Sequence, residues 1–497
     1  MRPGLLLAGL VALLLSLPAT GARAGEWVRA ESERFIVYSD VSAQATERFT
    51  RRLETYDRVL RLAMGLPPEV APLRKLPIYL TQKPNGLDLV RPGISRDVAG
   101  FYMATTEDVF AVAEYGASDH VLFHEYAHHF MYQNFDASFP GWFVEGFAEY
   151  YMTADIRRDG VDVGKFNEDR VLWLNHAPWM SLDDLLAQRP RVGARQHDTY
   201  YPLAWLVTHW FMNEPSRRPM LVAYLNGLGR GADGAAAMEQ AVGMPLPEFK
   251  KTLETYLHAR WPFRRVTYDF PEAAVAITPL PAAADDLILL GQRLKIGVRE
   301  SQIEQTMADV RAAAALHPGD PMAQLIQGHM EIERGDKALG KTLLLQVLEA
   351  QPNNVEALHY LAVASMTAAD EDPDNASTLI REARGYLTRA YQIDDANYLT
   401  FMLLAQSRDA SPGYPNDNDM TTWRLAFNLA RQLPSIRLGY ASALTLRDRG
   451  PEAIVVLRPL ANAPHGGGEA DAAQAMIDHI QSEGGPVRID VETLPEE

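Results

Sequence analysis

The pentapeptide His124-Glu-Tyr-Ala-His128 constrains the fold more than any other part of this sequence. On an α-helix, residues i and i+4 lie about 40° apart around the axis, so both imidazoles leave the helix on one face. Two histidines at this spacing, with a glutamate directly after the first, form the HExxH pattern of zinc-binding helices. The motif is flanked by the apolar residues Val121, Leu122, Phe123, Phe130 and Met131. The sequence therefore predicts a buried metal-binding helix over Ala117–Asn134.

The composition limits what could hold such a metal. The 497 residues include no cysteine, so thiolate ligands, thiol catalysis and disulfide bonds are excluded. A formal net charge of -17, without a long Lys/Arg run, excludes the basic surface of a nucleic-acid-binding protein. The length exceeds what one hydrophobic core usually serves, so two or more domains are expected. Any metal must be held by histidine and carboxylate side chains.

A second segment, Pro140–Tyr151 (PGWFVEGFAEYY), reads as another helix that carries Glu145 and Glu149 four residues apart. Glu145 lies 145 - 128 = 17 residues after the second histidine, a spacing that suits an antiparallel helix pair. HExxH followed by W-x-x-E-G-x-A-E resembles the gluzincin (peptidase-MA-like) families, which include thermolysin and the alanyl-type aminopeptidases. By that resemblance, Glu145 is the third zinc ligand. Glu149 is expected to accept a hydrogen bond from a ligand imidazole.

The ligand set implied by the resemblance defines a hydrolytic chemistry. Three protein ligands leave one position on Zn²⁺ for a water molecule, whose pKa the metal lowers to about 7. Glu125 is the candidate general base, which takes the proton and passes it to the leaving amine. A developing oxyanion needs one more donor. Tyr201 is favoured because it resembles the tyrosine that opens the matching helix in related proteins, and Tyr200 and His197 are the alternatives.

The expected substrate is a peptide or protein. In related folds an edge strand pairs with the peptide main chain, and Val109–Ala113 is expected to be that strand because it precedes the metal-binding helix. The sequence lacks the G-x-M-E-N phrase with which aminopeptidases hold a free amino terminus. We therefore expect a zinc endopeptidase. The alternative is a catalytically silent, peptidase-like scaffold that acts as a tetratricopeptide adaptor.

Residues 25–280 are predicted to form the α+β, zincin-like metallopeptidase domain, with a small mixed sheet and several helices. Besides the two helices described above, hydrophobic spacing predicts strands at Phe35–Tyr38 and Leu76–Leu80, a hairpin of Gly100–Met103 with Val109–Val112, and helices at Ala43–Met64, Asp198–Met212 and Leu246–Arg260. The Pro- and Ala-rich stretch Tyr268–Asp285 has no amphipathic period. It indicates a domain boundary near residue 280.

Residues 281–490 resemble a short, irregular tetratricopeptide array, an all-α domain that could bind a protein partner. Pro318 and Pro352 are 352 - 318 = 34 residues apart, which is the period of that repeat. Other features that fit the repeat, or its expected irregularity, are the small residue Gly328, the turn Gly335-Asp336, the polar insertion Asp370–Ser377 and a degenerate helix pair from Ser435 to Leu460. The predicted architecture is therefore a metallopeptidase domain followed by a repeat array.

Residues 1–24 (MRPGLLLAGLVALLLSLPATGARA) are expected to be a signal peptide. They have an early Arg2, an apolar run over Leu5–Leu17 and the small-residue exit Ala22-Arg23-Ala24. The apolar run is shorter than the about 20 residues that a membrane-spanning helix needs. We expect export to the periplasm or beyond, with no stable membrane insertion after cleavage.

Overall fold

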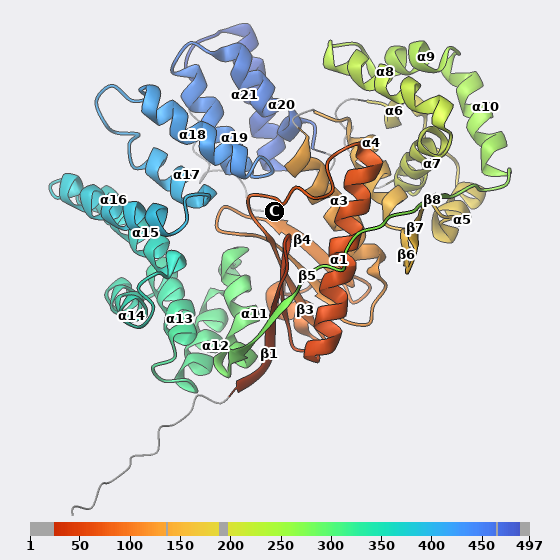
Figure 1. Ribbon diagram of the computed structural model, residues 1–497. Helices are drawn as coiled ribbons and strands as arrows, with labels where there is room; N and C mark the ends of the chain where they lie inside the picture. Colours follow the sequence, from red (N-terminus) through yellow and green to blue (C-terminus); the bar gives the residue numbers. More distant parts are fainter. Residues whose placement is uncertain (1–23, 136–137, 188–196, 464–465, 488–497) are drawn as a thin grey trace, which may run out of the picture.

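The computed structural model describes residues 24–135, 138–187, 197–463 and 466–487, which form a mixed sheet with helices and then a helical array (Figure 1). The expected signal peptide lies outside these residues, apart from Ala24. The large sheet has six strands: β1 (Ala24–Glu31), β2 (Phe35–Ser39), β3 (Leu76–Thr81), β4 (Gly100–Ala104), β5 (Val109–Glu114) and β9 (Ala276–Pro281). Their spatial order is β4-β5-β3-β2-β1-β9. The pairs β2–β3 and β3–β5 are parallel, and the other three pairs are antiparallel.

Helices cover both faces of this sheet. On one face lie α1 (Ala43–Met64) and α3 (Asp119–Asn134), and on the other lie α2 (Gly86–Val90) and α11 (Ala283–Lys295). Successive residues of a strand point to opposite faces, so a strand covered on both sides must be apolar throughout. In β5 the residues Val109, Ala111 and Ala113 pack with α1 and α3, while Phe110 and Val112 pack with α2 and α11. This is why VFAVA reads as a continuous apolar run.

The edge of the sheet differs from the expectation. The predicted hairpin forms, with Gly100 opposite Ala113 and Ala104 opposite Val109. However, β5 lies between β4 and β3, so the expectation that Val109–Ala113 is the edge strand is wrong. The hairpin turn folds β4 onto the outer side of β5, and the edge strand beside α3 is β4.

The other helices of the α+β part pack beyond α3 and largely against one another, and a small second sheet accompanies them. This sheet has three antiparallel strands, β6 (Asp155–Arg157), β7 (Gly160–Val163) and β8 (Arg264–Val266). The helices are α4 (Gly141–Tyr151), α5 (Glu168–His176), α6 (Leu182–Leu185), α7 (Tyr200–Asn213), α8 (Arg218–Gly229), α9 (Gly234–Val242) and α10 (Leu246–Leu257). No helix within the described ranges combines the length and apolar character needed to cross a membrane.

The C-terminal helices form an array of stacked pairs, as predicted. They are α12 (Ile303–Ala315), α13 (Pro321–Arg334), α14 (Lys337–Ala350), α15 (Val355–Glu371), α16 (Ala376–Ile393), α17 (Tyr398–Gln406), α18 (Asp417–Leu429), α19 (Pro434–Thr445), α20 (Gly450–Ala461) and α21 (Gly468–Ser482). The first residues of α13 and α15 are 355 - 321 = 34 positions apart. Where α13 crosses α14, a Cβ on Gly340 would lie 2.9 Å from the Gly328 carbonyl oxygen, so the crossing requires small residues.

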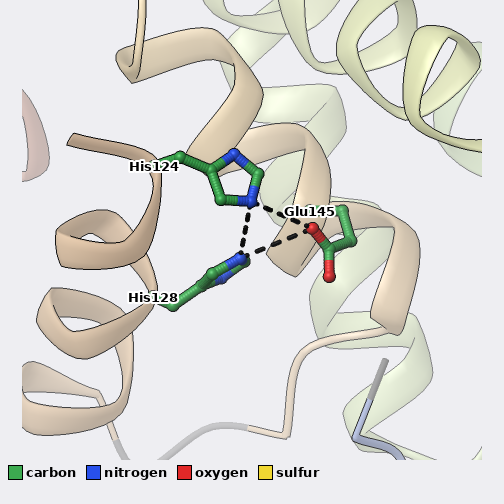
Figure 2. Close-up of side chains that lie close together, drawn as sticks. All are labelled: His124, His128 and Glu145. Carbon is green, nitrogen blue, oxygen red and sulfur yellow. Dashed lines mark hydrogen bonds and ion pairs between the residues drawn. The ribbon is translucent and has the colours of Figure 1, made fainter. Parts of the chain in front are cut away.

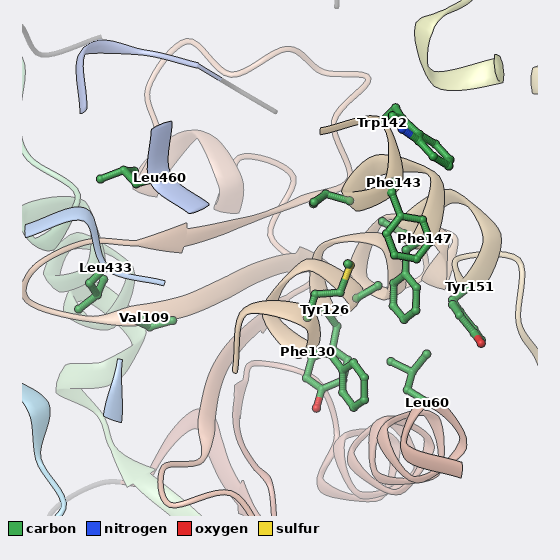
Figure 3. Packing of buried hydrophobic residues seen from close by; sticks show 14 of the residues in the cluster. Leu60, Val109, Tyr126, Phe130, Trp142, Phe143, Phe147, Tyr151, Leu433 and Leu460 are labelled. Atoms are coloured by element: carbon green, nitrogen blue, oxygen red, sulfur yellow. The ribbon is translucent and has the colours of Figure 1, made fainter. Parts of the chain in front are cut away.

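The array packs against the α+β part at both of its ends. Helix α11, on which α12 and α13 of the array pack, places Ile288 and Leu289 in the core on its face of the sheet, against Trp27 and Phe110. At the other end, α17 to α21 contribute to the large core cluster around α1, α3 and α4. Figure 3 shows residues from both parts of this cluster, Leu433 and Leu460 from the array and Val109, Tyr126 and Phe130 from the α+β part.

The boundary expected near residue 280 falls within a strand. β9 ends at Pro281 and pairs with β1 through partners that include Ala30–Ile277 and Arg29–Thr278. Helix α11 then begins at Ala283 and packs directly on the sheet. The Pro- and Ala-rich stretch is therefore partly an edge strand, and the two parts of the chain share their cores.

Replacing Leu289 by Ala should destabilise the whole chain. This side chain is 4% exposed between α11 and the sheet, and truncating a buried leucine costs about 2 to 5 kcal/mol. Leu345→Ala, at a site on α14 that is 40% exposed, is the matched control. Urea unfolding should show a lower midpoint for Leu289→Ala alone, and equal midpoints for the two variants would contradict the shared core.

Candidate metal centre

Three potential ligand atoms from two helices converge at one point (Figure 2). The two Nε2 atoms of His124 and His128, on α3, are 3.1 Å apart, and each lies 3.4 Å from Oε2 of Glu145 on α4. Ligand atoms of a tetrahedral cation with bonds of about 2.0 to 2.1 Å are separated by about 3.3 Å. The three separations therefore fit one small cation bound to all three side chains.

Helix α3 is held to α1 by hydrogen bonds on the side away from this site. The Tyr56 hydroxyl donates to the backbone oxygen of Phe123 at 3.0 Å. The Tyr126 hydroxyl donates to Oδ1 of Asp57 at 2.7 Å. Because these two anchors lie on either side of His124 along the helix, they fix the rotation of α3 about its axis. The imidazoles are thereby directed toward α4.

Helix α4 is positioned by a close approach to α7. A Cβ on Gly146 would lie 2.1 Å from Oγ1 of Thr208 and 2.4 Å from the backbone oxygen of Ala204, so no larger residue fits there. The indole of Trp142 also donates a hydrogen bond to the Tyr224 hydroxyl at 3.0 Å. The glycine after Glu145 thus allows α4 to lie between α3 and α7 with every residue buried.

Glu149 lies behind His124, on the side of its other ring nitrogen. His124 Nδ1 is 3.6 Å from Glu149 Oε1, so the expected hydrogen bond is instead a longer ion-pair contact. Both oxygens of Glu149 accept hydrogen bonds of 2.7 Å from Arg170 of α5. Arg170 therefore holds the Glu149 carboxylate in place beside the His124 ring.

The carboxylates around His124 change its affinity for protons. Burial lowers the pKa of His124, but its hydrogen bond with Glu145 and the charges of Glu149, Glu145 and Glu125 outweigh burial and raise this pKa to about 9. A protonated imidazole cannot bind a metal, so a cation must displace this proton. Metal affinity should accordingly increase as pH rises toward that value.

The three candidate oxyanion donors lie at the start of α7. Tyr200 is 1% exposed, whereas Tyr201 is partly exposed and its ring centre is 5.8 Å from the Arg170 guanidinium carbon. Nδ1 of His197 is directed to Thr199, at 3.0 Å from its hydroxyl. Through Arg170, Tyr201 is connected to the carboxylate beside His124.

Two contacts at the site have no signal in the sequence. Arg170 lies 21 residues after Glu149 on a separate helix, and no motif spacing joins them. The Tyr102 hydroxyl on β4 lies 3.0 Å from Nδ1 of His129 and joins the edge strand to α3. His129 is not among the converging ligand atoms of the described residues.

Comparisons with known proteins add little to this geometry. A scan against protein-family models and a search of curated proteins gave no match. Among solved structures, a tetratricopeptide-repeat protein of Thermus thermophilus aligns over 39% of this chain and 99% of its own length, with 16% identity and a TM-score of 0.35. A similarity this weak carries no argument about function, which must rest on the side chains themselves.

Removing Arg170 should leave the buried carboxylate of Glu149 without its ion-pair partner. Glu149 is 1% exposed, and deleting one partner of a buried ion pair costs about 3 kcal/mol or more. Arg170→Met should therefore lower the free energy of unfolding by that amount. Arg449→Met is the control, because Arg449 forms its ion pair with Glu452 at the surface.

A double substitution separates charge from packing. Adding Glu149→Gln to Arg170→Met removes the unpaired carboxylate charge. A denaturant titration of the double variant should therefore show that part of the lost free energy of unfolding is restored. An additive loss in the double variant would contradict the assigned pairing.

Proposed function

We propose that this chain is an exported zinc peptidase that cleaves within peptide chains. The observation that carries the proposal is the convergence of His124, His128 and Glu145 at separations of 3.1, 3.4 and 3.4 Å. Two imidazoles and one carboxylate, with no cysteine, form a ligand set typical of catalytic zinc. The proposal of export rests on the sequence pattern of residues 1–24.

Each residue of the site then has a distinct task. When bound, zinc supplies a Lewis acid that polarises a peptide carbonyl and lowers the pKa of water. Glu125 follows His124 on α3 and is partly exposed, so it can take up a proton and pass it to the leaving amine. Glu145 is fully buried, which suits a ligand and not a group that exchanges protons with solvent. The two glutamates are therefore not interchangeable.

The edge strand β4 gives the proposed substrate a place to bind. Among the described residues, β4 has a strand neighbour on one side only. An extended peptide could add to its other side through main-chain hydrogen bonds. The contact between Tyr102 and His129 holds this edge beside α3. Main-chain pairing of this kind suits cleavage within a chain.

A silent adaptor is the alternative. The stacked pairs α13–α14 and α15–α16 have the architecture of protein-binding repeats, and this function needs no cation. We prefer the peptidase because an adaptor role does not account for the three metal-ligand side chains held together between α3 and α4. The adaptor function also assigns no role to Glu125.

Glu125→Gln and Glu145→Gln should have different phenotypes. Glu125→Gln keeps the three ligands and removes the proton acceptor, so hydrolysis should fall by about two to four orders of magnitude while zinc content stays at the wild-type value. Glu145→Gln should instead lose zinc. Elemental analysis and cleavage of a quenched fluorescent peptide measure the two properties. Full activity in Glu125→Gln, or a zinc-free wild-type chain after zinc-replete preparation, would refute the proposal.

Tyr201→Phe tests the oxyanion donor. Loss of a donor to the developing charge should lower kcat by about a hundredfold or more with little change in KM. Tyr200→Phe, at the adjacent buried position, is the comparison and should leave kcat near the wild-type value. The reverse pattern would assign the role to Tyr200.

A further inference from the structure

A second group of potential metal ligands lies at the turn between β4 and β5. Glu107 of this turn faces helix α13 of the repeat array, where His329 and Glu333 are one helical turn apart. Nε2 of His329 is 3.2 Å from Oε2 of Glu107 and 3.3 Å from Oε1 of Glu333. One ligand atom from each residue lies within 4.8 Å of the other two. These separations resemble those of the candidate centre between α3 and α4.

The ring nitrogen at the centre of this group is buried between two carboxylates. The His329 side chain is 3% exposed, and its Nε2 forms ion-pair contacts with Glu107 and Glu333 but no hydrogen bond of good geometry within the described chain. The ring stacks on Tyr360 with centroids 4.0 Å apart and planes at 10°, so it cannot tilt freely toward either oxygen. Burial lowers the pKa of His329, but the carboxylates of Glu107 and Glu333 outweigh burial and raise this pKa to about 10, so without a metal the three groups form an ion pair. A cation between the nitrogen and the two oxygens would take the place of this proton and contact all three atoms.

The surrounding charges also favour a cation. Contacts run from Glu107 through Tyr360 to Glu356, from Glu356 to Lys295, and on through Asp108 to Arg74. With His329 neutral, the carboxylates of this connected network exceed its cations by two. The carboxylates are Glu107, Asp108, Glu333 and Glu356, and the cations are Lys295 and Arg74. A divalent cation would bring the network to zero net charge, which favours burial.

We propose that Glu107, His329 and Glu333 bind one divalent cation that fastens the β4–β5 hairpin to the repeat array. One imidazole and two carboxylates form a ligand set that Zn²⁺ and Mn²⁺ both accept. β4 leads directly into the turn that carries Glu107, so the cation would also fix the sheet edge beside α3. The role is structural, and it holds whether the chain is a peptidase or an adaptor.

The test uses the full chain without its first candidate centre. In His124→Ala/His128→Ala, bound Zn²⁺ reports the second site alone. After chelator treatment, calorimetric titration with Zn²⁺ should show one equivalent bound, and Zn²⁺ should raise Tm. Adding Glu333→Gln should weaken binding at least about tenfold. Glu349→Gln, an exposed carboxylate on the neighbouring α14, is the matched control and should change nothing.

Two outcomes would overturn the proposal. One is the absence of Zn²⁺ binding in the folded double-alanine chain, and the other is equal binding in the Glu333→Gln and Glu349→Gln variants. The cluster would then be an ion pair between protonated His329 and two glutamates. If the double-alanine chain does not fold, the unaltered chain decides, because Glu333→Gln should reduce its Zn²⁺ from two equivalents to one. Failure at this site leaves the centre at His124 and His128 untouched.

Discussion

The hydrogen bond from Tyr126 to Asp57 is the contact on which the candidate centre depends. Asp57 is fully buried, and its carboxylate lies 2.6 Å from Arg34 Nε and 2.7 Å from Arg61 Nε. Rotating α3 would break this bond inside a low-dielectric core, where an unmade polar contact is expensive. The imidazoles of His124 and His128 leave the opposite side of the helix, so this rigid face determines where they point.

The sequence predicted the elements that depend on the spacing of residues close together in the chain. Helix α1 has the predicted bounds, the hairpin forms, and α13 and α15 begin one repeat period apart. The prediction that Val109–Ala113 is the edge strand was wrong because β5 also pairs with β3, a strand from much earlier in the chain. Strand β9 could not be predicted because none of its residues is fully buried and the strand gives no apolar alternation. For the site, the HExxH motif together with the gluzincin resemblance that assigns Glu145 named the three side chains that converge. The contact between Arg170 and Glu149 depends on tertiary packing and has no such signal.

The repeat array is part of the scaffold of the centre and not an appendage. The turn between β4 and β5 contacts α11 through Asp108, α13 and α15 through Glu107, and α19 through Thr106 and Ser435. A hairpin held at its tip by four helices has little freedom at its base, where β4 meets α3. Binding of a partner to the array would thus act on the same elements that position the metal-ligand helix, which gives a physical route for coupling between the two parts.

The pairing of β1 with β9 has a consequence for biosynthesis. Ala24 lies opposite Pro281, so the first described strand acquires this neighbour only after more than half of the chain has been made. Until then the sheet is unfinished at β1, and α11 is not yet present to cover one of its faces. Contacts between such distant segments form late and slowly. The sheet is consequently incomplete until β9 and α11 have been made, and an incompletely folded chain of this kind is what the proposed export through a translocation channel requires.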